Sequence, residues 1–160
     1  MDDINAAIER GLELEKEGNE QQAIDYFLAL AEQYPDHPRV RFEVAGAYDF
    51  AGREAEAVPH YRRAYELGVT DEYLLYYHIQ LGSTLRNIGQ FEEALELLRQ
   101  GSERFPDDRA MRAFYALALF SAGRAGDALA EVLTITLDVP DFYPAYRRAL
   151  RYYADEVRGK

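Results

Sequence analysis

The chain has 160 residues, of which 48% are apolar and 29% are charged, and this length allows a single domain with a substantial core. It contains no cysteine, which excludes a disulfide framework, a thiolate metal site and a cysteine nucleophile. Its formal charge of −11 disfavours nucleic acids and anionic membrane surfaces as partners, because both would repel it.

The same features favour a cytoplasmic location. The absence of cysteine suits a reducing compartment. The stretch MDDINAAIERGLELEKEGNE lacks the basic and apolar segments of a secretory signal. No apolar run approaches the roughly 20 residues that cross a bilayer. We therefore expect a cytoplasmic protein that does not bind membranes.

Small residues and prolines recur in one register along the chain. Glycine recurs at spacings of 34, 37 and 34 residues, at Gly18, Gly52, Gly89 and Gly123. Alanine follows with the same spacings, at Ala23, Ala57, Ala94 and Ala128. Proline occupies a third register at Pro35, Pro106 and Pro140, and Val69 stands where a fourth proline would be. Three markers in one register indicate an internal repeat.

Each marker has a physical role in a pair of helices. The glycine adopts positive φ at little cost and so ends a first helix in a tight turn. The alanine lets the paired helix approach closely, and the proline stops the second helix. In chain order, the repeat divides the sequence into units at about 4–37, 38–71, 75–108 and 109–142, followed by a helix at about 143–158.

Several local features modify this pattern. Pro59 lies about two turns into a helix of the second unit and should kink or delay it. Three extra residues around 69–74 predict a local irregularity between the second and third units. The stretch VLTITLDVP (132–140) favours strand, but its position in the repeat makes it the end of a helix. The terminal helix should cover the exposed apolar side of the last unit.

In the third unit, the pattern consists of Leu81, Gly82, Leu85, Gly89, Ala94, Leu98, Gly101 and Pro106. It resembles the tetratricopeptide repeat family, and the resemblance covers nearly the whole chain. The resemblance implies an all-α, right-handed superhelix (α-solenoid) of four helix-turn-helix units plus a C-terminal capping helix, in one domain over 1–160. The acidic, cysteine-free composition is similar to that of small stand-alone bacterial members.

In this family the first helix of each unit lines a concave groove, and the second helix forms the convex back. The resemblance therefore implies groove positions at Asn5, Ile8, Glu9, Leu12, Arg39, Phe42, Glu43, Gly46, Asp49, Tyr76, Ile79, Gln80, Ser83, Arg86, Ala113, Phe114 and Leu117, with Arg147, Arg148 and Arg151 added by the terminal helix. Aromatic anchors among charges suit a peptide. The Lys/Asn/Arg clamp for chaperone tails is not matched, because Ile8 and Leu12 stand where it begins. The three arginines would instead suit an acidic stretch of a ligand, or pair locally with acids such as Asp155.

Residues for catalysis do not converge in the sequence. The chain lacks the phosphate-binding, dinucleotide-binding, zinc-protease and serine-hydrolase motifs. Its three histidines, His37, His60 and His78, are widely separated and do not form a ligand pair. Acidic pairs such as Glu92 and Glu96 fit an exposed helix face. We therefore expect no enzymatic activity, no cofactor and no metal site.

Two functions remain open. The favoured one is a non-catalytic scaffold that binds a protein or peptide in the groove. The alternative is a self-associating module, a homodimer that uses the tyrosine-rich segment 72–78 or oppositely charged ends. Residues 1–36 contain ten acids and two bases, whereas residues 141–160 contain five bases and three acids.

Overall fold

A computed structural model describes residues 2–139 and 146–158 of the chain, with side chains from residue 4 onward. These residues form nine helices and no strand. The helices are α1 (Asp2–Lys16), α2 (Glu20–Gln33), α3 (Pro38–Phe50), α4 (Glu54–Glu66), α5 (Asp71–Asn87), α6 (Phe91–Arg104), α7 (Arg109–Ser121), α8 (Ala125–Leu137) and α9 (Arg147–Val157). The first residues expected for the terminal helix, 143–145, lie outside the described part of the chain.

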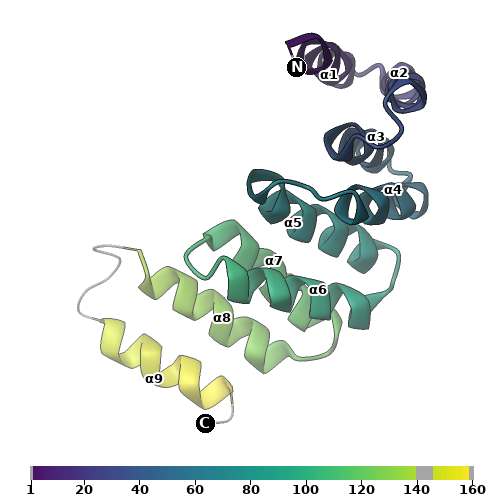
Figure 1. Cartoon of the computed structure of the whole chain (residues 1–160). Coiled ribbons are helices and arrows are strands. Elements are labelled where there is room, and N and C mark those ends of the chain that lie inside the picture. The colour runs from purple at the N-terminus through teal and green to yellow at the C-terminus, as the bar shows by residue number, and fades with distance from the viewer. Residues whose placement is uncertain (1, 140–145, 159–160) are drawn as a thin grey trace.

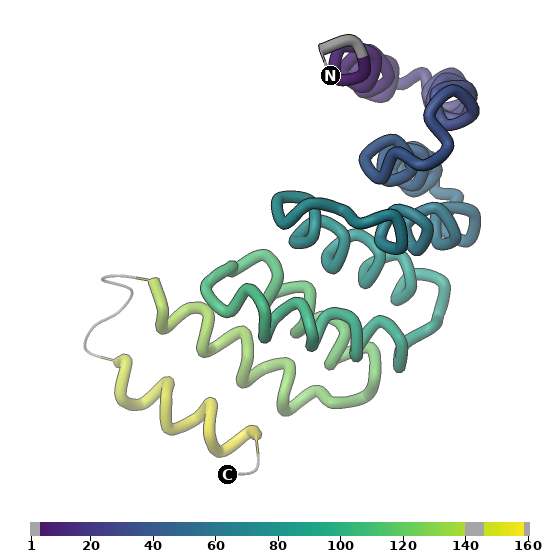
Figure 2. The backbone as a smooth tube through the Cα atoms, in the orientation of Figure 1, coloured from purple at the N-terminus to yellow at the C-terminus, as the bar shows by residue number. Residues whose placement is uncertain are grey.

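Consecutive helices pair into four antiparallel hairpins that stack along one curved axis (Figure 1). Each hairpin contacts the next through its second helix, and the first helices also contact one another, in the series α1, α3, α5 and α7. The two ends of the chain lie at opposite ends of the stack (Figure 2). The expected solenoid of helix-turn-helix units is therefore confirmed.

The turn inside each hairpin is the one that the repeated glycines predict. Gly18, Gly52, Gly89 and Gly123 have φ values between 68° and 82°. In the first turn, the Asn19 N–H donates to the Leu14 carbonyl over 3.0 Å, and the Gly18 N–H donates to the Glu15 carbonyl. This pair of bonds is a Schellman motif, which closes a helix with a residue in the left-handed region. The same pair of bonds recurs in the other three hairpins.

Small residues set the distance between the helices of a hairpin. A Cβ atom placed on Gly82 would collide with the side chain of Leu98, and one on Gly11 would collide with the ring of Phe27. The equivalent position in the second unit is Ala45, which is completely buried. The first helix of each hairpin therefore packs on the second with at most a methyl group between them.

The three extra residues after the second unit lengthen a helix and do not disrupt the stack. Helix α5 begins at Asp71 and has 17 residues, whereas α3 and α7 have 13 each. The added turn carries Glu72 and Tyr73 at the start of α5. Helix α4 begins at Glu54 and continues through Pro59, so the proline does not delay it. Pro59 takes away the helical partner of the Ala55 carbonyl, and both residues are exposed.

Helix α8 continues to Leu137, as its place in the repeat predicts. Helix α9 covers the last hairpin only in part, because among the described helices it contacts α8 alone. It approaches α8 closely at Gly126, where a Cβ atom would collide with the Val157 carbonyl oxygen. Among the described helices, α7 makes no contact with α9, so the terminal helix covers the α8 side of the last unit and not the whole apolar side that the sequence predicts.

Candidate functional site

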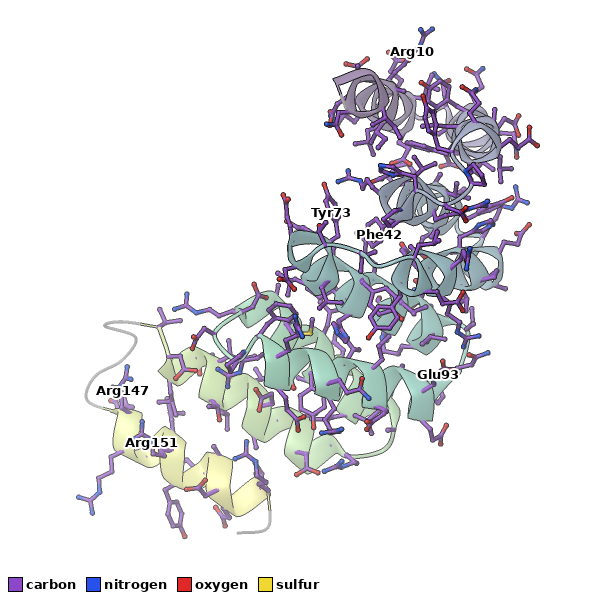
Figure 3. All side chains as sticks on the ribbon, in the orientation of Figure 1. Arg10, Phe42, Tyr73, Glu93, Arg147 and Arg151 are labelled. Atoms are coloured by element: carbon purple, nitrogen blue, oxygen red, sulfur yellow. The ribbon has the colours of Figure 1, made fainter. Side chains whose placement is uncertain are left out.

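A cavity of about 650 Å³ opens between the first three hairpins, on the side formed by their first helices. We call it the N-terminal groove. Its lining residues are Leu12, Glu15, Arg39, Phe42, Glu43, Gly46, Asp49, Phe50, Glu54, Tyr61, Glu72, Tyr73, Tyr76, Gln80 and Asn87. In Figure 3, Phe42 and Tyr73 lie between α3 and α5, close to this opening.

A hydrogen-bonded polar cluster forms one part of the groove wall. The Tyr61 hydroxyl, on α4, lies 3.2 Å from Asp49 Oδ2 on α3 and 2.9 Å from Gln80 Oε1 on α5. The Thr84 hydroxyl lies 2.7 Å from the same Asp49 oxygen. Burial raises the pKa of Asp49, although hydrogen bonds from Thr84 and Tyr61 oppose the shift. Burial and the nearby Asp49 carboxylate raise the pKa of Tyr61, so its hydroxyl stays protonated and can donate.

A second cluster holds a cation against an aromatic ring. The Arg39 guanidinium lies 3.9 Å from the centroid of the Tyr73 ring and forms an ion pair with Glu43 one turn along α3. The Tyr73 ring also meets Phe42 edge to face, with centroids 5.7 Å apart. The Glu43 side chain is buried, which raises its pKa against the lowering effect of Arg39. The groove therefore contains a built cation–aromatic–carboxylate arrangement.

The groove is strongly acidic. Five carboxylates line it, from Glu15, Glu43, Asp49, Glu54 and Glu72, against one cationic side chain. Burial, together with the charge of Glu43, raises the pKa of Glu15 to about 7. One of the Glu15 carboxylate oxygens, Oε1, is buried and has no hydrogen-bond partner among the described residues.

The structure brings together part of the set that the sequence predicts. Leu12, Arg39, Phe42, Glu43, Gly46, Asp49, Tyr76 and Gln80 all line the N-terminal groove. Ile8 does not, because it is 2% exposed and packs with Ile24 and Phe27 in the core. Ile79 and Phe114 pack against another buried cluster, which contains Leu98 and Met111. Arg86, Ser83, Asn5 and Glu9 are not among the lining residues of this cavity.

Ala113 and Leu117 lie elsewhere, in a second cavity of about 530 Å³ between α7 and α8. We call it the C-terminal apolar groove. Its lining residues are Ala113, Ala116, Leu117, Phe120, Ala125, Ala128, Leu129 and Val132. This groove is the surface that α9 leaves uncovered, and Phe120 in it is 67% exposed.

The arginines of the terminal helix are remote from the N-terminal groove. Arg147 and Arg151 lie on α9, at the end of the stack opposite Arg10 (Figure 3). Arg147 donates to the backbone carbonyls of Leu137 and Val139, at and just beyond the end of α8. Arg148 and Arg151 are exposed. The expected contribution of these arginines to one continuous binding surface with the groove is therefore not observed.

Seven lining residues were not predicted from the sequence, and they fall into three groups. Glu72, Tyr73 and Glu15 lie one helical turn from residues that were predicted, so a search along the same helix face would have found them. Phe50 and Asn87 lie at the ends of first helices. Tyr61 and Glu54 come from a second helix, which the family pattern assigns to the convex back.

Within residues 2–139 and 146–158, no group of three or more His, Cys, Asp or Glu side chains is arranged to hold a metal ion. In the same residues, no helix combines the length and the apolar character needed to span a membrane.

Comparison with known proteins agrees with this geometry. A family model described as "Tetratrico peptide repeat" matches residues 38–157, and one described as "Tetratricopeptide repeat" matches residues 11–37. The curated proteins that were compared include no match to the chain.

Several solved structures share the fold at low sequence identity. A MamA fragment from Desulfovibrio magneticus RS-1 has a TM-score of 0.73 and 16% identity, over 98% of this chain and 92% of that one. A putative kinesin light chain with TPR-like repeats, from Podosopora anserina, has a TM-score of 0.75 and 18% identity, over 98% and 87%. YrrB, a TPR protein, has a TM-score of 0.70 and 16% identity, over 96% and 86%. The family match extends over most of the sequence and the stacked hairpins agree with it, so the chain belongs to the tetratricopeptide repeat family.

Proposed function

We propose that this protein is a non-catalytic scaffold that binds an extended segment of a partner protein in the N-terminal groove. The observation that carries the proposal is the pairing of exposed aromatic rings with fixed polar groups in one cavity. Phe50 and Tyr76 are 58% and 48% exposed there, beside the hydrogen-bonded side chains of Asp49 and Gln80. Aromatic rings supply contact area at low entropic cost, and fixed polar groups set the direction of a bound chain.

The chemistry of the groove supports binding over catalysis. Its described lining contains no Ser, Thr, Cys, His or Lys, so the Ser–His and Cys–His pairs of nucleophilic catalysis are missing from that surface. Two of its three carboxylates with a raised pKa are already engaged, Glu43 by Arg39 and Asp49 by Thr84. YrrB, a protein of similar fold, is described as having an unusual peptide-binding site.

The lack of cysteine also favours a cytoplasmic location.

Selection from a random peptide library displayed on phage, with roughly 12 residues per peptide, tests this function because it needs no known partner. We expect enriched peptides that bind the wild-type protein and lose binding to a Phe50→Ala/Tyr76→Ala variant. The matched control is Tyr34→Ala/Phe91→Ala, which removes two exposed aromatic rings outside the groove. Peptides that bind all three proteins equally, or no enrichment at all, would contradict the proposal.

Self-association is a second candidate, and the C-terminal apolar groove favours it. That groove is lined entirely by apolar side chains. Its Phe120 and Leu117, on α7, are exposed, and α9 does not contact α7. A second copy is the occupant we propose, because a two-fold contact would bury the same apolar surface on both chains. Light scattering after size-exclusion chromatography should show a concentration-dependent dimer that Phe120→Glu abolishes and Phe91→Glu preserves. A monomer at all concentrations would remove this candidate.

A further inference from the structure

We propose that the N-terminal groove selects a basic segment, in which an arginine or lysine side chain lies between an aromatic ring and a carboxylate of the groove. This inference rests on the proposed function, because it names the chemistry of the segment that the groove would bind. It assigns the groove a charge preference and a way of holding the cation.

The charges of the cavity favour a cationic ligand. Five carboxylates line the groove, and its one cation, Arg39, is already paired with Glu43. Glu54 and Glu72 remain as carboxylates with no cationic partner in that lining. Because concave walls of low dielectric concentrate the potential of such groups, a cationic ligand gains more here than at an open surface. An acidic segment would be repelled by the same field.

The protein already holds a guanidinium in this groove. Arg39 lies 3.9 Å from the Tyr73 ring centroid and pairs with Glu43, so one cation is held by a ring face and a carboxylate together. This contact shows that an arginine head fits between these walls without leaving its charge unpaired.

The combination of an aromatic ring and a carboxylate recurs nearby, where the groove lining has no further cationic side chain to pair with it. Tyr76 is 48% exposed and lies one turn after Glu72 on α5, so both side chains share one helix face. Phe50 is 58% exposed at the end of α3, and Glu54 begins α4 just beyond the turn. Both rings and both carboxylates line the cavity. They supply the two components that hold Arg39, in a part of the groove open to a ligand.

Three synthetic peptides that differ only in charge test the inference directly. The first is fluorescently labelled Gly-Arg-Leu-Arg-Phe-Arg-Gly, with blocked ends. In the second, citrulline replaces each arginine and keeps its shape without the charge, and in the third, glutamate replaces each arginine. Fluorescence anisotropy would give the dissociation constants at about 50 mM and about 300 mM salt. We expect the arginine peptide to bind about tenfold more tightly than the citrulline peptide at low salt, and the glutamate peptide to bind most weakly.

Charge variants of the protein separate a local effect from the overall field. Glu54→Gln/Glu72→Gln removes two carboxylates of the groove, whereas Glu20→Gln/Glu32→Gln removes two exposed carboxylates of α2. Both variants have the same net charge. We expect the groove variant to weaken binding of the arginine peptide by about fivefold or more, and the α2 variant to change it by less than about twofold.

Equal binding of the arginine and citrulline peptides, no binding of the arginine peptide, or equal losses in the two charge variants would overturn the basic-segment inference. The proposed function would survive such a result if phage-selected peptides still depended on Phe50 and Tyr76. Loss of that dependence would overturn the proposed function itself, so the two failures are distinguishable.

Discussion

Gly82 of α5 packs directly against Leu98 of α6, with no room for a side-chain carbon between them. A Cβ atom on Gly82 would lie well inside contact distance of the Leu98 branch, which is completely buried. We predict that Gly82→Ala destabilises the fold by about 1–3 kcal/mol, because the two helices must move apart or Leu98 must leave its rotamer. Urea unfolding followed by circular dichroism measures the change.

Gly46 provides the matched control for this prediction. It also lies inside a first helix, but a Cβ atom there would meet only Glu43 Oε2, at 3.9 Å. We expect Gly46→Ala to leave stability unchanged or to raise it by up to about 1 kcal/mol, since alanine favours helix. Similar losses of stability at both glycines would show that helix spacing is not the cause.

Tyr61 links three helices through its hydroxyl group, which contacts Asp49 on α3 and Gln80 on α5. We predict that Tyr61→Phe costs about 1–2 kcal/mol, because the half-buried Asp49 carboxylate loses one of its donors. The control is Tyr65→Phe on the same helix, where the ring is 52% exposed. Thermal unfolding of both variants gives the comparison, and equal shifts in Tm would contradict the prediction.

The repeated small residues account for how much of this fold the sequence could predict. Gly18 and its equivalents require a left-handed turn wherever they occur, and positions such as Gly82 and Ala45 require close helix pairs. These constraints are local, so they can be found by spacing alone. Four hairpins follow from them without any knowledge of long-range contacts.

The site was less predictable because its composition depends on long-range packing. Ile8 and Leu12 lie on the same stripe of α1, and the packing of α2 and α3 on α1 decides that Ile8 is buried and Leu12 lines the groove. Tyr61 reaches the groove from a second helix because its long side chain crosses the hairpin. The incomplete cover by α9 depends on how α9 packs on α8 at Gly126, which the repeat spacing does not determine.

Glu15 should make stability depend on pH in a defined direction. Burial and the charge of Glu43 raise its pKa in the folded state to about 7, from an ordinary value of 4.5. Between these values the folded protein holds more protons than the unfolded chain, so this contribution to stability falls as pH rises from about 4.5 to about 7 and is constant above. We predict that Glu15→Gln gains stability relative to the wild type over this interval.

Denaturation midpoints in urea, measured at intervals between about pH 5 and about pH 8, test this prediction. Glu43 and Asp49 also have raised pKa values, but they are present in both proteins and contribute to both curves. Glu20→Gln, which removes an exposed carboxylate on α2, controls for the loss of one negative charge. A pH-independent difference between the wild type and Glu15→Gln would refute the assignment.

An ion-pair network connects the last three helices, and its central arginine is 13% exposed. Arg112 Nε, on α7, lies 2.7 Å from Glu131 of α8 and its Nη1 lies 2.5 Å from Asp138, while Arg158 at the end of α9 lies 3.8 Å from Glu131. We predict that Arg112→Met lowers stability by about 2 kcal/mol, because it leaves Glu131 without its close partner. The double variant Arg112→Met/Glu131→Met should recover part of the loss, since an apolar pair needs no partner charge.

Hydrogen exchange in α7 and α8 is the measurement, because solenoid ends can open independently of the rest. Unchanged exchange in Arg112→Met would show that the network does not hold this end of the stack together.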